Sequence, residues 1–328
     1  MELRTVFNID PSEKKITYDD PVIFIGSCFA TSIGRQFETG HLPVIINPSG
    51  TVYNPVSVCN TLDTIINRVP YNKSDLYNNN GIWLSFSHYT DFSSADSAKV
   101  VEKINIASKE ALAFLEAARF LFITFGTARV YRWKQSGKIV SNCHKIPSAE
   151  FTHELLSVND IVTIWNEQLE KLQLLNPELK VIFTISPVRH LKDGAHGNQV
   201  SKSILFLAVD ELLKHPSKPG YFPAYELVMD DLRDYRFYDN DMLHPSSSAI
   251  DYIWNAFTRC YFDNSTMEIW KEVTKITKAV SHRVQTDSGE GVRKFAEKIL
   301  ARIDSITKRI PTVDLNSERK YFLELLDS

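Results

Sequence analysis

Short apolar runs alternate with amphipathic stretches over about the first 260 residues of the chain. The runs are rich in β-branched and aromatic residues and too short for helices, which predicts buried strands. Strands that are apolar throughout, separated by helices, are typical of a parallel sheet covered on both faces. We therefore expect a three-layer α/β/α sandwich with a mainly parallel sheet. The expected strands are Val22–Ile25, Val44–Ile46, Phe120–Phe125 and Val181–Ile185, with helices at Thr31–Glu38 and Val56–Asn67.

Two polar segments interrupt this alternation. Asn72–Ala98 is rich in Asn, Ser and Asp and contains one strand-like run, Ile82–Phe86. Val130–Val140 has the pattern of a hairpin around Ser136 and Gly137. Both patterns predict insertions that lie outside the central sheet.

After about Phe262 the strand pattern stops and helical periodicity takes over. Three helices are expected, at Met267–Val284, Gly291–Arg309 and Ser317–Leu326, with Pro311 separating the last two. This segment predicts a helical extension rather than a second sheet domain. The expected division is an α/β domain over 1–262, with insertions near 72–98 and 130–145, and a C-terminal helical extension over 263–328.

Composition and charge narrow the possible functions. Apolar residues make up 43% of the chain and charged residues 23%, which is ordinary for a globular protein. The formal net charge of −3 lacks the basic excess that nucleic-acid binding requires. No apolar run approaches the roughly 18 residues of a membrane span, and the first residues lack the apolar core of a secretory signal. We therefore expect a cytoplasmic protein that binds neither nucleic acid nor membrane.

The four cysteines are scattered, with no C-x-x-C pair and no spacing typical of a disulfide framework or a zinc site. We expect reduced thiols, no metal site and no cofactor. The cysteines are Cys28, Cys59, Cys143 and Cys260.

Candidate catalytic groups follow the predicted strands, at the edge where open α/β sheets bind ligands. Ser27 and Cys28 follow the first strand and lead into a helix, whose free amides favour a thiolate or an oxyanion. Asp241 lies three residues before His244, a spacing at which a carboxylate can orient an imidazole as a base. Gly50 follows the second strand, and its amide is a candidate oxyanion donor.

Each of these features also has a structural interpretation. Asp241 and His244 can belong to a surface loop before a capped helix. Cys28 can be a small buried apolar residue, and Gly50 can serve a turn that needs positive φ. The sequence pattern alone leaves both interpretations open.

Several stretches resemble a known family. VIFIGSCFATSIGRQF is similar to the first block of the SGNH/GDSL hydrolases, and DMLHPS is similar to their last block, Asp-x-x-His-Pro. The string GSCFA is the name-giving motif of the GSCFA family, bacterial proteins related to that superfamily. NPSGTVYNP, FGTARVYRW, TISPVRH and YRFYDNDMLHPS resemble further stretches of the family, in order, over about residues 20–260. The chain is identified as a member, which implies an SGNH/flavodoxin-like fold.

The resemblance nominates two nucleophiles. If Gly26 takes the place of the glycine in Gly-Asp-Ser, then Ser27 replaces the aspartate and Cys28 replaces the nucleophilic serine. Gly34 matches the glycine common in the following helix and supports this register. The alignment favours Cys28, whereas the chemistry of the superfamily favours Ser27, so both are retained as candidates.

The third block departs from the superfamily pattern Gly-x-Asn-Asp. Gly126 and Thr127 match, but Ala128 and Arg129 replace the Asn and the Asp. The missing asparagine would complete the oxyanion hole, and its loss would cost about 3 kcal/mol of transition-state stabilisation if nothing replaced it. Candidates for a replacement donor are Asn142, Arg129 and Asn54.

Three other side chains are candidates for substrate binding. Arg189 and His190 follow the fourth predicted strand and can bind an anionic or sugar group, or belong to a solvated loop. His88, in the first insertion, can face the same pocket, although lone histidines usually have ordinary packing partners.

The resemblance implies an SGNH-like hydrolase of an acyl ester or thioester, with O-acetyl groups on carbohydrate as one substrate class. His244, oriented by Asp241, would take the proton from Cys28 or Ser27, and an acyl-enzyme would then be hydrolysed. The same groups would serve an acyltransferase. A third hypothesis is a ligand-binding module whose active site has decayed. The expected partner is a small-molecule or carbohydrate ester, and the sequence does not specify the oligomeric state.

Overall fold

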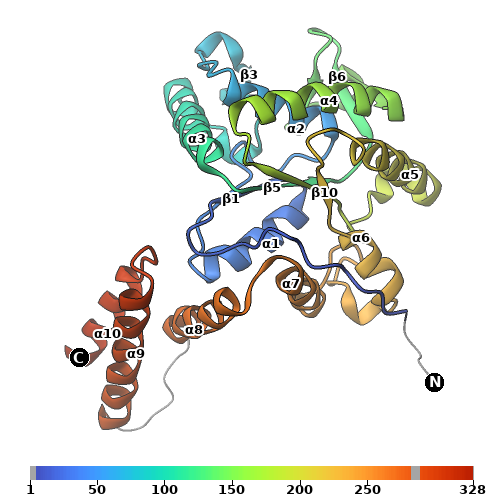
Figure 1. Cartoon of the computed structure of the whole chain (residues 1–328). Helices are drawn as coiled ribbons and strands as arrows, with labels where there is room; N and C mark the ends of the chain where they lie inside the picture. The colour runs from blue at the N-terminus through green and yellow to red at the C-terminus, as the bar shows by residue number, and fades with distance from the viewer. Residues whose placement is uncertain (1–4, 282–288, 328) are drawn as a thin grey trace. The chain divides into compact units, whose positions relative to one another are not determined.

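The computed structural model describes residues 5–281 and 289–327 (Figure 1). Contacts between Cα atoms divide the chain into two compact units. The first unit comprises residues 1–8, 22–34 and 45–253, and the second comprises 9–21, 35–44 and 254–328. The helical extension expected over 263–328 therefore belongs to the same compact unit as two segments from early in the chain. Hydrophobic periodicity does not predict this association.

The first unit is built on a five-stranded sheet in the order β10-β9-β5-β1-β2. β1 pairs in parallel with β5, β5 with β9, and β9 with β10, which confirms the predicted parallel sheet. In chain order the strands run 2-1-3-4-5, the flavodoxin-like order, in which the connections reverse direction between β1 and β5. The strands are β1 Val22–Gly26, β2 Val44–Ile46, β5 Phe120–Phe125, β9 Lys180–Ile185 and β10 Gly220–Tyr221.

Helices cover both faces of this sheet, which confirms the three-layer architecture. Figure 1 shows α2 and α4 on one face and α1 on the other. Local sequence explains the helix starts: Asn54 caps α2 ahead of a proline at its first position, and Ser157 and Asp160 form a capping box on α4. The helices are α1 Cys28–Thr39, α2 Pro55–Ile66, α3 Ser97–Ala117, α4 Val158–Leu175, α5 Gly194–Leu212, α6 Ala224–Glu226 and α7 Ser247–Tyr261.

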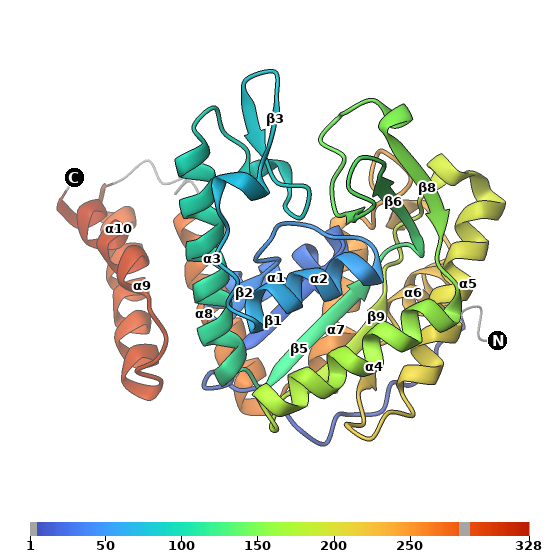
Figure 2. The same cartoon turned by 90° about the horizontal axis from the view of Figure 1, so that it is seen from above.

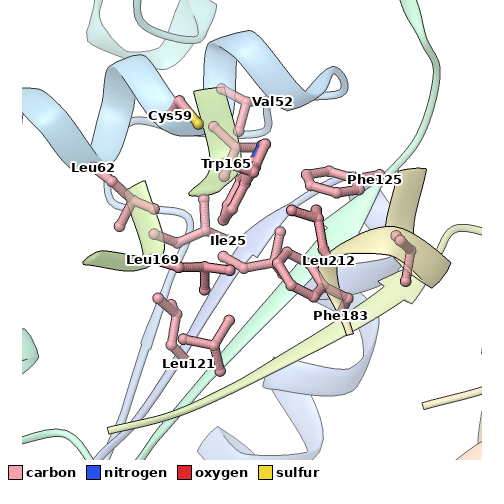
Figure 3. Packing of buried hydrophobic residues seen from close by; sticks show 14 of the residues in the cluster. Ile25, Val52, Cys59, Leu62, Leu121, Phe125, Trp165, Leu169, Phe183 and Leu212 are labelled. Atoms are coloured by element: carbon pink, nitrogen blue, oxygen red, sulfur yellow. The ribbon is translucent and has the colours of Figure 1, made fainter. Parts of the chain in front are cut away.

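Aliphatic and aromatic side chains pack together between the sheet and the helices on one of its faces (Figure 3). Trp165 of α4 is fully buried and packs edge-on against Phe125 of β5 and Phe183 of β9, with ring centroids 5.1 Å apart in both pairs. Its indole N–H donates to the carbonyl oxygen of Pro55 at 3.2 Å, so the buried polar atom is satisfied.

The two predicted insertions form small sheets. The first contains the hairpin of β3 (Tyr77–Asn79) and β4 (Ile82–Leu84). The second contains the expected hairpin of β6 (Arg129–Trp133) and β7 (Ile139–Val140), and β6 also pairs with β8 (Phe151–Leu155), which periodicity did not predict. In Figure 2 the β5 arrow runs toward the side on which both small sheets lie.

The second unit contains the predicted C-terminal helices, α8 (Asn264–Ser281), α9 (Gly289–Arg309) and α10 (Asn316–Asp327). The last residues of the first expected helix, 282–284, lie outside the described residues. Rings of Trp254 and Phe257 pack edge-on against Phe37 in the core of this unit. Within the described ranges, every helix is too short or too polar to cross a membrane.

Candidate active site

The carboxyl ends of β1 and β5 meet at the point where the strand connections reverse, which is where open α/β sheets bind ligands. Gly26 ends β1 with φ at 144°, and a Cβ there would lie 2.2 Å from the carbonyl oxygen of Thr124. Only glycine fits this close approach. Ser27 then donates its amide to the same oxygen at 3.2 Å, and α1 begins at Cys28.

Ser27 and Cys28 are neighbours in the chain but differ in accessibility. The Ser27 side chain is buried, and its Oγ accepts the amide of Phe29 at 3.3 Å, so it caps α1. Cys28 is only partly buried. The Ser27 hydroxyl therefore points toward the start of α1, whereas the Cys28 thiol is partly exposed to solvent.

Opposing influences act on the pKa of Cys28. Burial raises the pKa, and this is the largest effect. Hydrogen bonds from the amides of Phe29 and Cys28 itself, and the positive charge of Lys202, lower it, while the negative charge of Asp241 raises it. Because the net shift is upward, the thiol is protonated at neutral pH and needs a base to become a nucleophile.

Asp241 holds the His244 ring in a defined orientation. Oδ2 of Asp241 lies 2.5 Å from Nδ1 of His244, and Oδ1 accepts the main-chain amides of Leu243 and His244 at 2.8 and 2.9 Å. These hydrogen bonds lower the pKa of Asp241 to about 2. Among the described residues Nε2 of His244 has no hydrogen-bond partner, so it is the nitrogen available as a base.

The Asp241–His244 loop lies within electrostatic range of the turn after β1. The charge of Asp241 acts on Cys28, and that of His244 acts on His190. Within the described part of the chain no hydrogen bond joins His244 to Ser27 or Cys28. In many active sites the hydrogen bond between base and nucleophile is long or absent until the substrate binds, so this separation is compatible with catalysis.

The amide of Gly50, predicted as an oxyanion donor, makes a hydrogen bond within its own turn in this structure. It donates to the carbonyl oxygen of Asn47 at 2.7 Å, and φ of Gly50 is 77°. The Asn47 side chain in turn accepts the amide of Gly26 at 2.7 Å and donates to Thr31 at 2.9 Å. Gly50 thus shapes the loop that supports the end of β1.

Gly126 lies against three groups of the site. A Cβ on Gly126 would lie 3.1 Å from the carbonyl oxygen of Tyr53, 3.2 Å from Nε2 of His190 and 3.5 Å from Cβ of Ser27. The carbonyl of Tyr53 accepts the amides of both Gly126 and Thr127, at 2.7 and 3.0 Å. Neither amide is therefore free for an oxyanion, but Gly126 lies against both His190 and Ser27.

His190 is a neutral imidazole at the centre of this edge. Its ring packs edge-on against Tyr53, with centroids 5.7 Å apart, and its ring nitrogens have no hydrogen-bond partner within the described ranges. Burial lowers the pKa of His190 to about 4, assisted by the positive charge of Lys202. A neutral imidazole can donate its N–H to a developing negative charge without itself carrying charge.

Thr127 and Arg129 turn toward α5 instead of the turn after β1. Oγ1 of Thr127 lies 3.0 Å from Oγ of Ser201 and accepts the amide of Arg129 at 3.0 Å. The Arg129 guanidinium lies 3.6 Å from the carboxylate of Asp193. The structure thus gives both residues supporting contacts, and the oxyanion role suggested for Arg129 is not supported by its position.

Asn142 and His88 lie in the insertions. Asn142 donates to Oγ1 of Thr90 at 3.2 Å and its Oδ1 accepts the amide of His144. His88 is buried, with Nδ1 2.8 Å from Oγ of Ser85, and burial lowers its pKa to about 4. Both side chains serve the internal structure of the insertions, so the packing interpretation of His88 is the one its position supports.

Arg189 carries a charge that no carboxylate in the described residues neutralises. Its guanidinium contacts the sulfur of Met229 at 3.3 Å, and its charge acts on Lys202 and Tyr238. An unpaired guanidinium beside the carboxyl edge of a sheet is suited to an anionic group of a substrate.

Lys202 is the residue of this site that sequence reasoning missed. It lies on α5, its side chain is only 1% exposed, and its Nζ donates to the carbonyl oxygens of Gly126 and Ser186. The signal for it was weak: one lysine in the run SKSILFLAV is usually solvated. No group of three or more His, Cys, Asp or Glu that could hold a metal occurs in the part of the chain that the structure describes.

Comparison with known proteins identifies the family. The model of the GSCFA family matches residues 21–257, and that of the C-terminal domain of GSCFA domain proteins matches 273–328. No curated protein matches the sequence. A carbohydrate esterase family 3 structure from Talaromyces cellulolyticus is 8% identical, with a TM-score of 0.35 over 77% of this chain and 99% of its own. A proposed GDSL-like lipase from Parabacteroides merdae is 11% identical, with a TM-score of 0.35 over 81% and 99%. Values this low carry no inference about activity.

Proposed function

This chain belongs to the GSCFA family, and we propose that it is an acyl hydrolase that uses Cys28, His244 and Asp241. The observation that carries the proposal is the 2.5 Å contact between Nδ1 of His244 and Oδ2 of Asp241, which leaves Nε2 free. The thiol at the helix N-terminus, the imidazole and the carboxylate have the chemistry of a nucleophile, a base and the group that orients the base.

Cys28 is the preferred nucleophile. The Ser27 hydroxyl is buried and caps α1, so attack by Ser27 would break the cap and require its side chain to turn outward. The thiol of Cys28 is partly exposed and lies beside the amides at the start of α1. A thiol also needs less activation than a hydroxyl, because its ordinary pKa is far lower.

His244 carries the proton through each step of the proposed reaction. Nε2 of His244 takes the proton from the thiol of Cys28, and the sulfur attacks the acyl carbonyl. The resulting oxyanion is stabilised by the main-chain amide of Cys28, which has no partner within the helix, and by the N–H of neutral His190. The tetrahedral species expels an alcohol or thiol, which receives the proton from His244. Water activated by His244 then releases the acid and restores the thiol.

The unpaired charge of Arg189 supports an acyl substrate that carries an anionic group near the scissile bond. O-acetyl groups on carbohydrate remain the substrate class that the family resemblance suggests. Esters of both kinds, offered with and without an acceptor alcohol, distinguish hydrolysis from acyl transfer.

Labelling with iodoacetamide and, separately, with a fluorophosphonate tests the proposal, with the modified residue mapped by peptide mass spectrometry. We expect alkylation at Cys28 that abolishes hydrolysis of 4-nitrophenyl acetate. His244→Ala should also abolish hydrolysis with the fold intact, whereas His215→Ala, which removes a histidine bonded to Ser217 elsewhere, should not. Fluorophosphonate at Ser27 would move the nucleophile to that residue. Full activity of His244→Ala, or labelling at neither residue, would refute the mechanism.

A further inference from the structure

Lys202 is a buried cation beneath the candidate active site. Its Nζ donates to the carbonyl oxygen of Gly126 at 2.7 Å and to that of Ser186 at 2.6 Å. These carbonyls follow β5 and β9, so the ammonium joins the ends of two central strands. Gly126 in turn lies against Ser27 and His190, as its surroundings show. Gly126 therefore lies between Lys202 and the turn that carries the proposed nucleophile.

The charge of Lys202 is not neutralised by a carboxylate. Within the described residues its hydrogen bonds go only to main-chain carbonyls, and the ring of Tyr225 lies 5.9 Å from Nζ. Burying an ammonium without an anionic partner is unfavourable, and such groups are frequent in active sites. An anion close to Nζ would therefore stabilise the charged form of Lys202.

The thiol of Cys28 is the group that can supply this anion. The charged groups that act on Lys202 are Cys28 and Arg189, and of these only Cys28 becomes negative. The interaction is reciprocal, because the charge of Lys202 also lowers the pKa of Cys28. Burial lowers the pKa of Lys202 to about 7, so near neutral pH the amine can gain a proton as the thiolate forms.

We propose that Lys202 is a positioning residue whose buried ammonium pairs with the Cys28 thiolate and so selects Cys28, rather than Ser27, as the nucleophile. The proposal rests on the acyl hydrolase function proposed above. The side chain that opposes the thiolate is Asp241, by its negative charge. Tyr53 shares the site, but its pKa is raised to about 12, so it stays neutral beside the thiolate. Lys202 is the cation that offsets Asp241. It acts through Cys28 and need not touch the substrate.

A second cysteine provides a matched control. Cys143 is also partly buried, burial raises its pKa, and the charge of Lys192 lowers it. Each thiol thus has its own lysine, and the two pairs can be tested against each other. Cys59 is buried with its pKa raised by burial, so its protection reports whether the chain is folded.

The experiment measures rate constants for alkylation of Cys28 and Cys143 by iodoacetamide from pH 6 to 9, in wild type, Lys202→Met and Lys192→Met. We expect Lys202→Met to slow alkylation of Cys28 by about tenfold at pH 7.5, which corresponds to a shift of about one pH unit, and to leave Cys143 unchanged. Lys192→Met should slow only Cys143. An unchanged rate at Cys28 in folded Lys202→Met would overturn the pairing.

If Lys202→Met fails to fold, Cys59 becomes reactive. The pH dependence of Cys28 alkylation in the wild type then tests the proposed pair. Two groups that share a proton give a thiolate fraction that stays nearly level between their two macroscopic pKa values. Alkylation of Cys28 should then be nearly constant between about pH 7 and 9, while Cys143 rises steadily. A simple single titration at Cys28 would refute the pairing.

These outcomes separate the two proposals. If the alkylation rate of Cys28 depends on Lys202 but the protein hydrolyses no ester, the Lys202–Cys28 pair is supported and the hydrolase function is rejected. Hydrolysis that depends on Ser27, with Cys28 indifferent to Lys202, would retain the hydrolase and reject the pair.

Discussion

Asp241 holds His244 at two points, since one carboxylate oxygen lies 2.5 Å from Nδ1 of the ring and the other accepts the main-chain amide of the same residue at 2.9 Å. The carboxylate therefore fixes both the loop backbone and the ring. Because hydrogen bonds lower the pKa of Asp241 to about 2, it stays ionised throughout the pH range of ordinary assays.

Replacing Asp241 with Asn should therefore impair catalysis far more than stability. We expect a fall in kcat of about 10²- to 10⁴-fold, since the amide favours the wrong imidazole tautomer. Thermal unfolding should change little, because the pair is exposed. The matched control is Asp239→Asn, whose carboxylate accepts, among the described residues, only the amide of Asn240. Equal losses in both variants would contradict a specific role for Asp241.

His190 should contribute to the transition state as a neutral donor. With its pKa lowered to about 4, the ring stays uncharged above about pH 5, so it should add no limb to the pH–rate profile there. We expect His190→Ala to lower kcat for 4-nitrophenyl acetate by about 10²-fold with little change in KM. His190→Asn, which keeps a side-chain N–H, should recover part of the rate. A larger KM with unchanged kcat would indicate a binding role instead.

His88 should make the protein acid-sensitive. Its pKa is lowered to about 4 in the folded chain, against about 6.5 when unfolded, so between these values the unfolded state binds more protons. The stabilisation is complete above about pH 6.5 and is lost as the pH falls toward 4, by about 3 kcal/mol. Urea unfolding at several pH values should show a shallower decline for His88→Gln. Parallel curves for variant and wild type would refute this assignment.

Gly34 should be intolerant of even one methyl group. A Cβ there would lie 2.7 Å from the side chain of Ile46, at the contact between α1 and β2. Alanine raises helix propensity by about 1 kcal/mol, but overpacking should outweigh this gain and leave a net loss of about 1–2 kcal/mol in urea unfolding. Adding Ile46→Val should restore part of the loss. Stabilisation by Gly34→Ala would show that α1 can shift.

The sequence pattern predicted four of the central strands to within a few residues, because long apolar runs such as Phe120–Phe125 have no alternative to burial. It also gave bounds close to those of α1, α2 and the three C-terminal helices, but it gave none for α3, α4 and α5. It missed β10, which has only two residues, and β8, whose sequence FTHEL is mostly polar. Strands this short or polar form only because a neighbouring strand pairs with them.

The candidate site was predicted in part. Family motifs led to Cys28 and His244, but the partner of the Gly50 amide depends on how the loop closes. The burial of Lys202 depends on which face of α5 meets the sheet. Neither property is encoded in residue spacing, so both required coordinates.

The carbonyl of Tyr53 has a consequence for how a ligand is accommodated. By accepting amides of both Gly126 and Thr127, it joins the loop after β2 to the turn after β5. Neither segment can shift without breaking hydrogen bonds to the other, so the floor of the site is preformed. For the proposed hydrolase, adaptation to substrates of different size would then fall to the β3–β4 and β6–β8 insertions, whose strands pair within small sheets of their own.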